Sequence, residues 1–411
     1  MMTRCHGTRR GPRRPPTAAI HETPALQGGY CVRRERCHAG SGFIGPVHVE
    51  ALRRLGVNVR GVLEATPELG VAAAQRMGLT RVYHSLDELL RDDDVQAVHI
   101  ATPNRLHFEM ASATMKAGKH VMCEKPLAMD SDETAQLVKL ARAANVVAGV
   151  NYNLRFYPLC LEARDMVARG DVGDVFHVCG SYVQDWLAKP TDYNWRVLAE
   201  QGGQLRAVAD IGTHWLDLVH SIVGQDIVEV FADLKTVHEV RQRPLGEIQT
   251  FKGQEETVAA TEPVNITTDD YGCVMLRFSN DTRGVLWVSQ VTPGRKNSVR
   301  FELAGSRCSL AWGSEDPNHI WVGHRDKANE FLMKDPALLS GTASAYTNYP
   351  GGHNEGFPST FKQCFRAFYD YIQAGDYDAP AEFATFEDGH REIKLCEAIL
   401  MSAQEDRWVQ V

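Results

Sequence analysis

Apolar positions beyond the first forty residues follow two alternating repeats, one typical of helices and one typical of buried strands. Helical spacing places Ile44, Val47 and Ala51 on one face of a predicted helix over 43–55. The next segment, 57–63, is a short apolar run that ends at an acid, as a buried parallel strand does. Further helices are predicted over 67–77, 106–117 and 132–144, and further strands over 95–101, 120–123 and 146–150. This βαβ alternation predicts an α/β domain with a mostly parallel sheet that helices cover on both faces.

From about residue 156 onward the pattern changes to longer strands in which apolar and polar positions alternate. Such alternation is expected of antiparallel strands that bury one face and leave the other in water. The predicted elements are strands over 176–183, 271–278, 284–291 and 298–304, and closing helices over 361–372 and 386–401. The sequence therefore predicts a second α/β domain over 156–411, built on a large, mostly antiparallel open sheet.

Residues 1–38 differ in composition and in periodicity from the rest of the chain. They hold paired arginines and prolines, and no period of a strand or a helix runs through them. They lack both the apolar core of a secretory signal and the amphipathic helix of a transit peptide. We therefore expect a disordered extension, or an artefact of a wrong start site or an upstream frameshift. The charged stretch 30–38 is poor material for a buried central strand, so the apolar first strand of the parallel sheet is expected to be missing.

Composition narrows the class of protein. The 411 residues are enough for two domains, and the hydrophobic content of 44% is ordinary for a globular protein. A net charge of −8 and a pI near 6.1 argue against a nucleic-acid binder. No apolar run approaches the ~18 residues that a membrane-spanning helix needs. The ten cysteines form no C-x-x-C pair and the histidines form no H-E-x-x-H, so we expect free thiols, no metal site and a cytoplasmic location.

A glycine fingerprint, Gly40-Ser-Gly42-Phe-Ile-Gly45, lies directly before the first predicted helix. In a dinucleotide-binding fold these glycines permit a tight turn, a close approach to the pyrophosphate and close packing of helix and strand. The N-terminus of the helix then supplies N–H donors to the anion. Glu64, at the end of the next strand, suits the acid that accepts from ribose hydroxyls and repels a 2′-phosphate, although a solvated acid would also fit there. The pattern predicts a Rossmann domain over 39–155 that binds NAD in preference to NADP.

Two further motifs place reactive side chains downstream of the glycines. Lys125, in Glu124-Lys-Pro126, follows an apolar strand and is therefore expected at the carboxyl edge of the sheet, beside the nicotinamide. Asp210 and His214 are spaced to share one face of a helix over 210–223. An imidazole titrates near neutral pH and can remove a hydroxyl proton while hydride leaves the carbon. The three side chains together favour catalysis, although singly they suit a surface turn, a helix N-cap and a buried core position.

The order of these motifs, with Thr102-Pro-Asn104 lying between the glycines and the lysine, resembles the Gfo/Idh/MocA oxidoreductases, the group of glucose–fructose oxidoreductase and inositol dehydrogenase. The similarity runs from about Gly40 to the C-terminus. It implies a catalytic set in which His214 is the general base, Lys125 orients and relays the proton, and Asp210 helps to place the substrate. A plain turn would use the same residues as the Thr-Pro-Asn motif. The residues expected to bind the cofactor are Gly40, Gly42, Phe43, Ile44, Gly45, Glu64, Thr102, Asn104, His107, Glu124 and Lys125.

Aromatic and hydrogen-bonding side chains in three predicted loops suit a polyhydroxylated ring. The expected substrate contacts are Asn153, Arg155, Trp186, Trp195, Arg196 and His353. No polybasic phosphate clamp is visible, which favours a neutral sugar, cyclitol or glycoside over a sugar phosphate. We therefore predict an NAD-dependent enzyme that reversibly oxidises a secondary hydroxyl to a ketone. By resemblance, the open face of the second sheet forms a homodimer or homotetramer.

Two other functions fit the same residues. One is a glycoside hydrolase or epimerase that uses tightly held NAD for a transient oxidation, since it would keep the same lysine and histidine. The other is a non-catalytic ligand sensor on the same scaffold. A sensor has no need for Lys125, Asp210 and His214 together, so their joint presence weighs against it.

Overall fold

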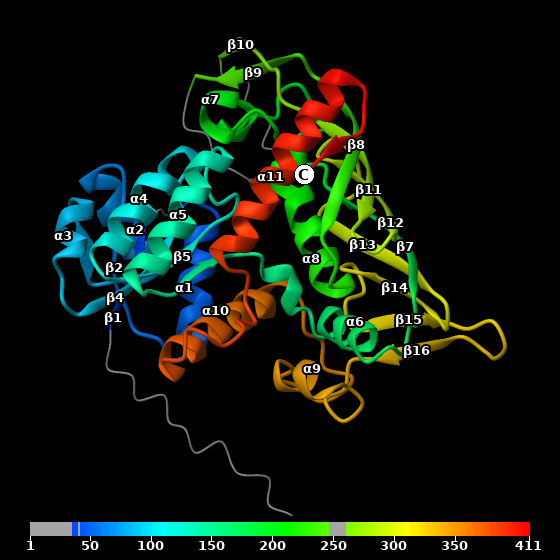
Figure 1. Cartoon of the computed structure of the whole chain (residues 1–411). Coiled ribbons are helices and arrows are strands. Elements are labelled where there is room, and N and C mark those ends of the chain that lie inside the picture. The colour runs from blue at the N-terminus through cyan, green and yellow to red at the C-terminus, as the bar shows by residue number, and fades with distance from the viewer. Residues whose placement is uncertain (1–34, 40–41, 246–259) are drawn as a thin grey trace, which may run out of the picture. The chain divides into compact units, whose positions relative to one another are not determined.

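A computed structural model describes residues 35–39, 42–245 and 260–411 (Figure 1). The described residues belong to one compact unit. Its first sheet has six parallel strands in the order β3-β2-β1-β4-β5-β6, which confirms the predicted parallel sheet. The strands are β1 (Glu35–Ala39), β2 (Val59–Leu63), β3 (Arg81–Tyr83), β4 (Val95–Ile100), β5 (His120–Cys123) and β6 (Ala148–Val150). The helices of this part are α1 (Ile44–Arg54), α2 (Pro67–Met77), α3 (Leu86–Leu90), α4 (His107–Lys116) and α5 (Ser131–Ala144).

The expectation that the first strand is missing is wrong. β1 lies in the middle of the sheet and pairs in parallel with β2 on one side and β4 on the other. Strand pairing is made by main-chain N–H and C=O groups, which every residue but proline supplies, so a charged sequence can still close the gap between two strands. The register of β1 is irregular just before Cys37 in both pairings. Residues 1–34 lie outside the described part of the chain, so the predicted boundary at 38/39 stays a prediction.

Local sequence signals explain where the helices of the first domain begin and end. α2 starts after Thr66, whose hydroxyl accepts from the N–H of Leu69, and has Pro67 in its first turn. It ends at Gly78, which has a φ of 61° that glycine adopts without strain. α5 starts after Asp130, whose carboxylate accepts from the third N–H of the helix. These caps hold the helices in place between strands whose carboxyl ends share one edge.

The second sheet has nine strands in the order β16-β15-β14-β13-β7-β12-β11-β8-β17. All neighbours are antiparallel except β7 and β12, so the predicted mostly antiparallel sheet is confirmed. The strands are β7 (Val175–Val183), β8 (Ile227–Lys235), β11 (Tyr271–Phe278), β12 (Arg283–Ser289), β13 (Ser298–Gly305), β14 (Ser309–Gly313), β15 (His319–Gly323), β16 (Glu330–Met333) and β17 (Val409–Gln410). A separate pair is formed by β9 (Val240–Pro244) and β10 (Thr261–Asn265).

Helices α6 (Pro158–Ala168), α8 (Thr213–Val223) and α11 (Phe386–Glu405) lie against one face of the nine-stranded sheet (Figure 1). Trp215 of α8 is fully buried there, and its indole N–H donates to the carbonyl of Arg300 at 2.9 Å. Gly180 makes this approach possible, because a Cβ on it would lie 2.1 Å from that carbonyl oxygen and 2.6 Å from the indole nitrogen. α8, which carries His214, is therefore fixed tightly against the sheet.

The C-terminal helices pack against elements of both domains. α10 (Phe357–Ala374) packs on α1 of the first sheet, where Phe361, Phe365 and Phe368 share a hydrophobic cluster with Val49 and Leu52. α11 contacts both α5 and β8. In the described part of the chain, none of the helices combines the length and apolar character that crossing a lipid bilayer requires.

Candidate active site

Lys125 and Asp210, which are far apart in sequence, meet at the carboxyl edge of the parallel sheet. Lys125 follows β5, and its Nζ donates to Asp210 Oδ1 at 2.8 Å and to the main-chain oxygen of Asp210 at 2.8 Å. The side chains are 13% and 17% exposed, so the pair is largely shielded from water without being sealed off. The structure thus brings together two of the three predicted catalytic residues in a direct ion pair.

Asp210 lies in a π-helical turn, Val208–Gly212, that runs directly into α8. The N-cap position of α8 is Gly212, so Asp210 is not a helix cap. Its carboxylate also accepts from Gln290 Nε2 at 2.7 Å and lies 3.6 Å from Arg196 Nε. Burial opposes ionisation, but Lys125 and Arg196 outweigh it and hold the pKa of the Asp210 carboxyl below its usual range. Asp210 is therefore a fixed anion, in a turn type that is frequent at functional sites.

His214, one helical turn further on, is a buried neutral base. Its exposed fraction is 9%, and its ring lies edge-on to Tyr152 with centroids 5.5 Å apart. Burial is the largest cause that lowers the pKa of His214, and the nearby Lys125 charge acts in the same direction. Glu124 and Asp210 oppose them less strongly, so the pKa falls to about 3. Its Nδ1 has no hydrogen-bond partner among the described residues. The imidazole is therefore uncharged at neutral pH, and one ring nitrogen has no partner within the described part of the protein.

The buried carboxylate of Glu124 accepts hydrogen bonds from two side chains that were not among the predicted site residues. Its Oε1 accepts from His48 Nε2 at 2.9 Å and from Asn151 Nδ2 at 2.5 Å. Burial would raise the pKa of Glu124, but the contact with His48, the Lys125 charge and the Asn151 hydrogen bond together outweigh it and lower the pKa to about 2. His48 Nδ1 in turn lies 3.0 Å from Nδ1 of His99, whose Nε2 lies 2.6 Å from the hydroxyl of Tyr369. A signal existed, because His48 interrupts the apolar face of α1.

The residues around the N-terminus of α1 fit a dinucleotide. Phe43, Ile44 and Gly45 form the start of the helix, and a Cβ on Gly42 would meet nothing within 4 Å, so there is open space beside the turn. Gly40 lies outside the described residues. Glu64 directly follows β2, and its buried Oε1 has no hydrogen-bond partner among the described residues. A carboxylate oxygen in this state can accept hydrogen bonds from the ribose hydroxyls of a bound dinucleotide. These two observations support a site for NAD at this edge.

The other predicted cofactor residues have protein partners. Thr102 Oγ1 lies 3.7 Å from Met110 Sδ. Asn104 Nδ2 donates to the carbonyl of Gly202, in the short helix α7 (Ala199–Gly202) of the second domain, at 2.9 Å. Both ring nitrogens of the fully buried His107 face main-chain oxygens, those of Pro126 at 2.8 Å and Thr102 at 2.9 Å. His107 therefore supports the loop after Lys125, and neither ring nitrogen is left for a ligand.

The predicted substrate residues separate into two groups. Arg196 lies beside Asp210, and its guanidinium stacks 4.5 Å from the ring centroid of Trp195. Trp186, in the same loop region, donates its indole N–H to Gln184 at 2.7 Å. Arg196 thus brings this loop beside the Asp210 carboxylate, and the two tryptophans are only partly buried.

The second group of predicted substrate residues makes contacts with other parts of the protein. Arg155 forms a bidentate pair with Asp217, at 2.7 and 2.5 Å. Asn153 is buried and donates to Thr360 of α10 at 2.6 Å. His353 is exposed and lies beside the buried Lys334, to which its carbonyl is bonded at 2.8 Å. The side chains of Arg155 and Asn153 are thus committed to holding elements together.

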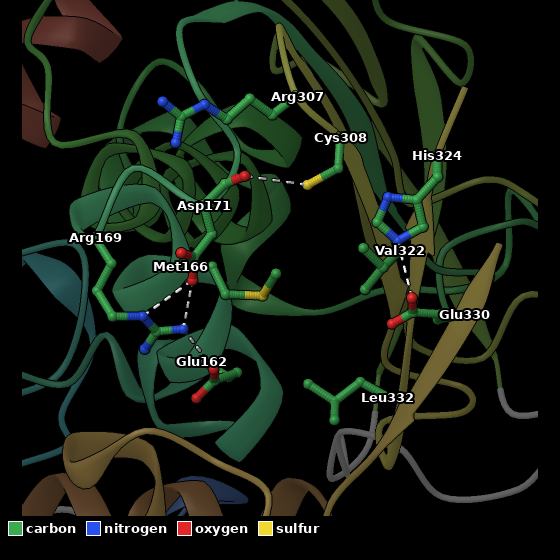
Figure 2. A pocket seen from close by; sticks show the side chains of 10 residues that line it. All are labelled: Glu162, Met166, Arg169, Asp171, Arg307, Cys308, Val322, His324, Glu330 and Leu332. Carbon is green, nitrogen blue, oxygen red and sulfur yellow. Dashed lines mark hydrogen bonds and ion pairs between the residues drawn. The ribbon is translucent and has the colours of Figure 1, made fainter. Parts of the chain in front are cut away.

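A separate hollow of about 270 Å³ lies between α6 and the β14–β16 edge of the second sheet (Figure 2). Its charged side chains pair with one another: Arg169 bonds Glu162 and Asp171, and His324 lies 3.3 Å from Glu330. Within residues 35–39, 42–245 and 260–411, no group of three or more His, Cys, Asp or Glu side chains could hold a metal ion.

Comparison with known proteins accounts for this arrangement. Residues 38–152 match the profile of an oxidoreductase family with an NAD-binding Rossmann fold, and residues 160–311 match the GFO/IDH/MocA C-terminal domain. A levoglucosan dehydrogenase of Pseudarthrobacter phenanthrenivorans is 30% identical over 393 residues, which are 90% of this chain and 96% of that protein. The chain belongs to the Gfo/Idh/MocA oxidoreductase family. The resemblance that the motifs suggested is confirmed, and so is the prediction of an oxidoreductase with an NAD-binding domain.

Solved structures of other Gfo/Idh/MocA proteins share the fold over nearly the whole chain. A levoglucosan dehydrogenase in complex with NADH and levoglucosan aligns with a TM-score of 0.81 at 28% identity, covering 92% of this chain and 99% of that one. An inositol dehydrogenase homologue from Azotobacter vinelandii in complex with NAD⁺ aligns with a TM-score of 0.81 at 25% identity, covering 92% and 97%. Both complexes contain a nicotinamide cofactor.

Proposed function

We propose that the protein is an NAD-dependent dehydrogenase that oxidises a secondary hydroxyl of a sugar, cyclitol or glycoside to a ketone, reversibly. The observation that carries the proposal is the ion pair of Lys125 with Asp210 at the carboxyl edge of the sheet, with the unpartnered imidazole nitrogen of His214 in electrostatic range. A strongly fixed anion, a cation and a neutral base together suit proton removal from a hydroxyl group.

The residues divide the work as follows. Lys125 gives two of its three N–H groups to Asp210, so one remains for the substrate oxygen. His214 is neutral in the free protein and accepts the hydroxyl proton as the hydride leaves the carbon, with the nearby Asp210 charge favouring the protonated ring; the proton then passes to solvent. When bound, NAD⁺ supplies the acceptor for the hydride of the carbinol carbon. Arg196 and the stacked Trp195 present a donor and an aromatic face on the substrate side.

Glu64 supports NAD over NADP as the cofactor. Its partnerless buried oxygen can accept from the ribose hydroxyls of NAD, whereas a 2′-phosphate at the same place would meet a carboxylate. The similarity to a levoglucosan dehydrogenase and to a myo-inositol 2-dehydrogenase from Thermotoga maritima, which is 27% identical over 212 residues, supports a neutral polyol as substrate class.

A substrate screen tests the proposal. Purified protein is incubated with NAD⁺ and with levoglucosan, inositols, free sugars and glycosides in turn, and the absorbance of NADH is followed. We expect NADH with at least one neutral polyol, and loss of that signal in Lys125→Met and His214→Ala. Release of free sugar from a glycoside without net NADH would replace the dehydrogenase by the hydrolase alternative. Unchanged turnover in His214→Ala would refute the catalytic roles.

We also propose that the protein is a homo-oligomer assembled through the open face of the nine-stranded sheet. Among the described residues this face carries no helix, and Met275 and Val285 lie directly opposite each other on β11 and β12, half exposed. Phe331 on β16 is 73% exposed. Such exposed apolar side chains are typical of subunit interfaces. Light scattering should give a dimer or tetramer, and a smaller species for Val285→Lys; a monomer at micromolar concentration would contradict the proposal.

A further inference from the structure

A chain of buried hydrogen bonds runs from the Asp210 carboxylate into the interior of the second domain. Gln290, directly after β12, donates its amide N–H to Asp210 Oδ2 at 2.7 Å. The Oε1 of Gln290 accepts from Arg206 Nη1 at 2.7 Å. Arg206 forms an ion pair with Asp270, and both side chains are shielded from solvent. Gln290 itself is 0% exposed, so water does not compete for these bonds.

The contact with Arg206 decides which way the Gln290 amide faces. A guanidinium has only donors, so the amide atom beside it must be the oxygen. The amide nitrogen therefore faces Asp210, whose ionised carboxylate has only acceptors. A flipped amide would set an oxygen against the carboxylate and N–H against the guanidinium, and both bonds would be lost.

We propose that Gln290 is a positioning residue for catalysis: held by Arg206, it fixes the Asp210 carboxylate so that its other oxygen keeps the Lys125 ammonium in place for the substrate. The two oxygens of Asp210 have separate partners, Lys125 on Oδ1 and Gln290 on Oδ2. Without the amide donor, Oδ2 would lose the hydrogen bond that Gln290 gives it, and the carboxylate would be free to turn about its terminal bond. The proposal rests on the dehydrogenase function for its kinetic consequences.

The same chain reaches the loop that carries the aromatic side chains. Arg241 is fully buried and donates Nη2 to Asp270 Oδ1 at 2.6 Å. Its Nη1 donates to the carbonyls of Lys189 and Asp192, at 2.9 and 3.0 Å. These carbonyls lie in the segment 186–195. The catalytic carboxylate and the loop beside it therefore share one buried anchor.

Three variants of the full-length protein test the role of Gln290. Gln290→Met keeps the length of the side chain but removes both polar contacts. Gln290→Glu keeps an oxygen for Arg206 but replaces the N–H donor by a second carboxylate oxygen. Gln363→Met is the matched control, because Gln363 is also a buried glutamine that donates to a carbonyl, that of Tyr346 at 2.7 Å, and bonds no catalytic residue.

Two measurements are made on each variant. The first is kcat/KM against pH with the polyol found in the screen. We expect Gln290→Met to lose about 10- to 100-fold, the loss typical when a partner that orients a metal ligand is removed, because Gln290 orients the Asp210 carboxylate in the same manner. The activity of Gln290→Glu relative to wild type should fall as pH rises, because the introduced carboxyl group can donate to Asp210 when protonated and repels it when ionised. A merely structural loss would not depend on pH.

The second measurement needs no turnover. Acetic anhydride at limiting concentration labels lysines, and mass spectrometry compares Lys125 with the exposed Lys139 in the same sample. We expect Lys125 to label severalfold faster in Gln290→Met than in wild type or Gln363→Met, because its amine is less often paired. If wild type forms no NADH, the dehydrogenase function fails while labelling still decides the positioning role. Equal labelling in all three proteins, or a pH-independent loss in Gln290→Glu, would overturn it.

Discussion

We expect Arg155→Met to lower the free energy of unfolding and to leave KM for the substrate unchanged. Arg155 was expected from the sequence to touch substrate, but its Nε and Nη2 donate to the two oxygens of Asp217 at 2.7 and 2.5 Å, and Asp388 lies 3.4 Å away. Asp217 is 1% exposed and lies on α8, the helix that carries His214. Removal of the guanidinium would leave this carboxylate buried with no close cation except Arg391 at 3.9 Å.

The expected magnitude follows from that burial. Breaking a buried ion pair by removing one partner costs about 3–5 kcal/mol, because the remaining charge loses its compensation. For a protein of this size the loss corresponds to a fall of roughly 4–6 °C in Tm. Burial already raises the pKa of Asp217, and Arg155 opposes that effect, so Asp217 should take up a proton when Arg155 is absent.

Calorimetry or urea unfolding measures the loss, and steady-state kinetics well below the transition measures KM for the polyol. Arg142→Met is the control: its partner Glu387 is at the surface, at 3.0 Å, and such exposed pairs contribute at most about 1 kcal/mol. The double variant Arg155→Met/Asp217→Leu should recover much of the stability, because both charges are then gone. Normal stability in Arg155→Met with a KM raised tenfold or more would refute the reasoning and return Arg155 to the substrate site.

Three further predictions concern the site. Because the pKa of His214 is lowered to about 3 from a usual value near 6.5, the unfolded chain binds the extra proton between these pH values, so this contribution to stability is complete above 6.5 and is lost as pH falls towards 3. Urea unfolding at several pH values should show a shallower slope in His214→Asn than in wild type, and equal slopes would contradict it. Glu64→Ser should weaken NADH binding about tenfold and improve that of NADPH, measured by fluorescence titration, since charged hydrogen bonds to ribose are lost. His48→Phe should lower the free energy of unfolding by about 1–3 kcal/mol, because Glu124 loses a partner while buried, and an unchanged urea midpoint would count against this.

The elements, and the positions of the residues proposed as catalytic, could be predicted from the sequence where the signal is local. Lys125 follows an apolar strand, and the carboxyl ends of parallel strands share one edge, so its place needs no tertiary detail. Asp210 and His214 lie one helical turn apart in one continuous segment. The π-helical geometry of that turn was not predictable, because nothing in the pattern of apolar positions distinguishes it from an α-helix.

Contacts between distant segments were not predictable. Arg155 lies in a loop directly after β6, where substrate contacts are common, but its direction is set by Asp217 on a helix about sixty residues later. The strand β1 was missed for a related reason: its side chains argue against a central strand, whereas its place follows from main-chain pairing with β2 and β4.

The buried polar residues fix the geometry around the predicted catalytic set. Glu124, the neighbour of Lys125, is held by His48 of α1, and Asp210 is held by Gln290 after β12. A fully exposed ion pair would contribute little to stability and would sample many geometries. Here the partners behind it are buried and hydrogen-bonded, so the geometry of the pair is over-determined before any substrate arrives. The predicted set of lysine, aspartate and histidine is therefore held in place by buried residues such as Gln290 and His48, which were not among the predicted site residues.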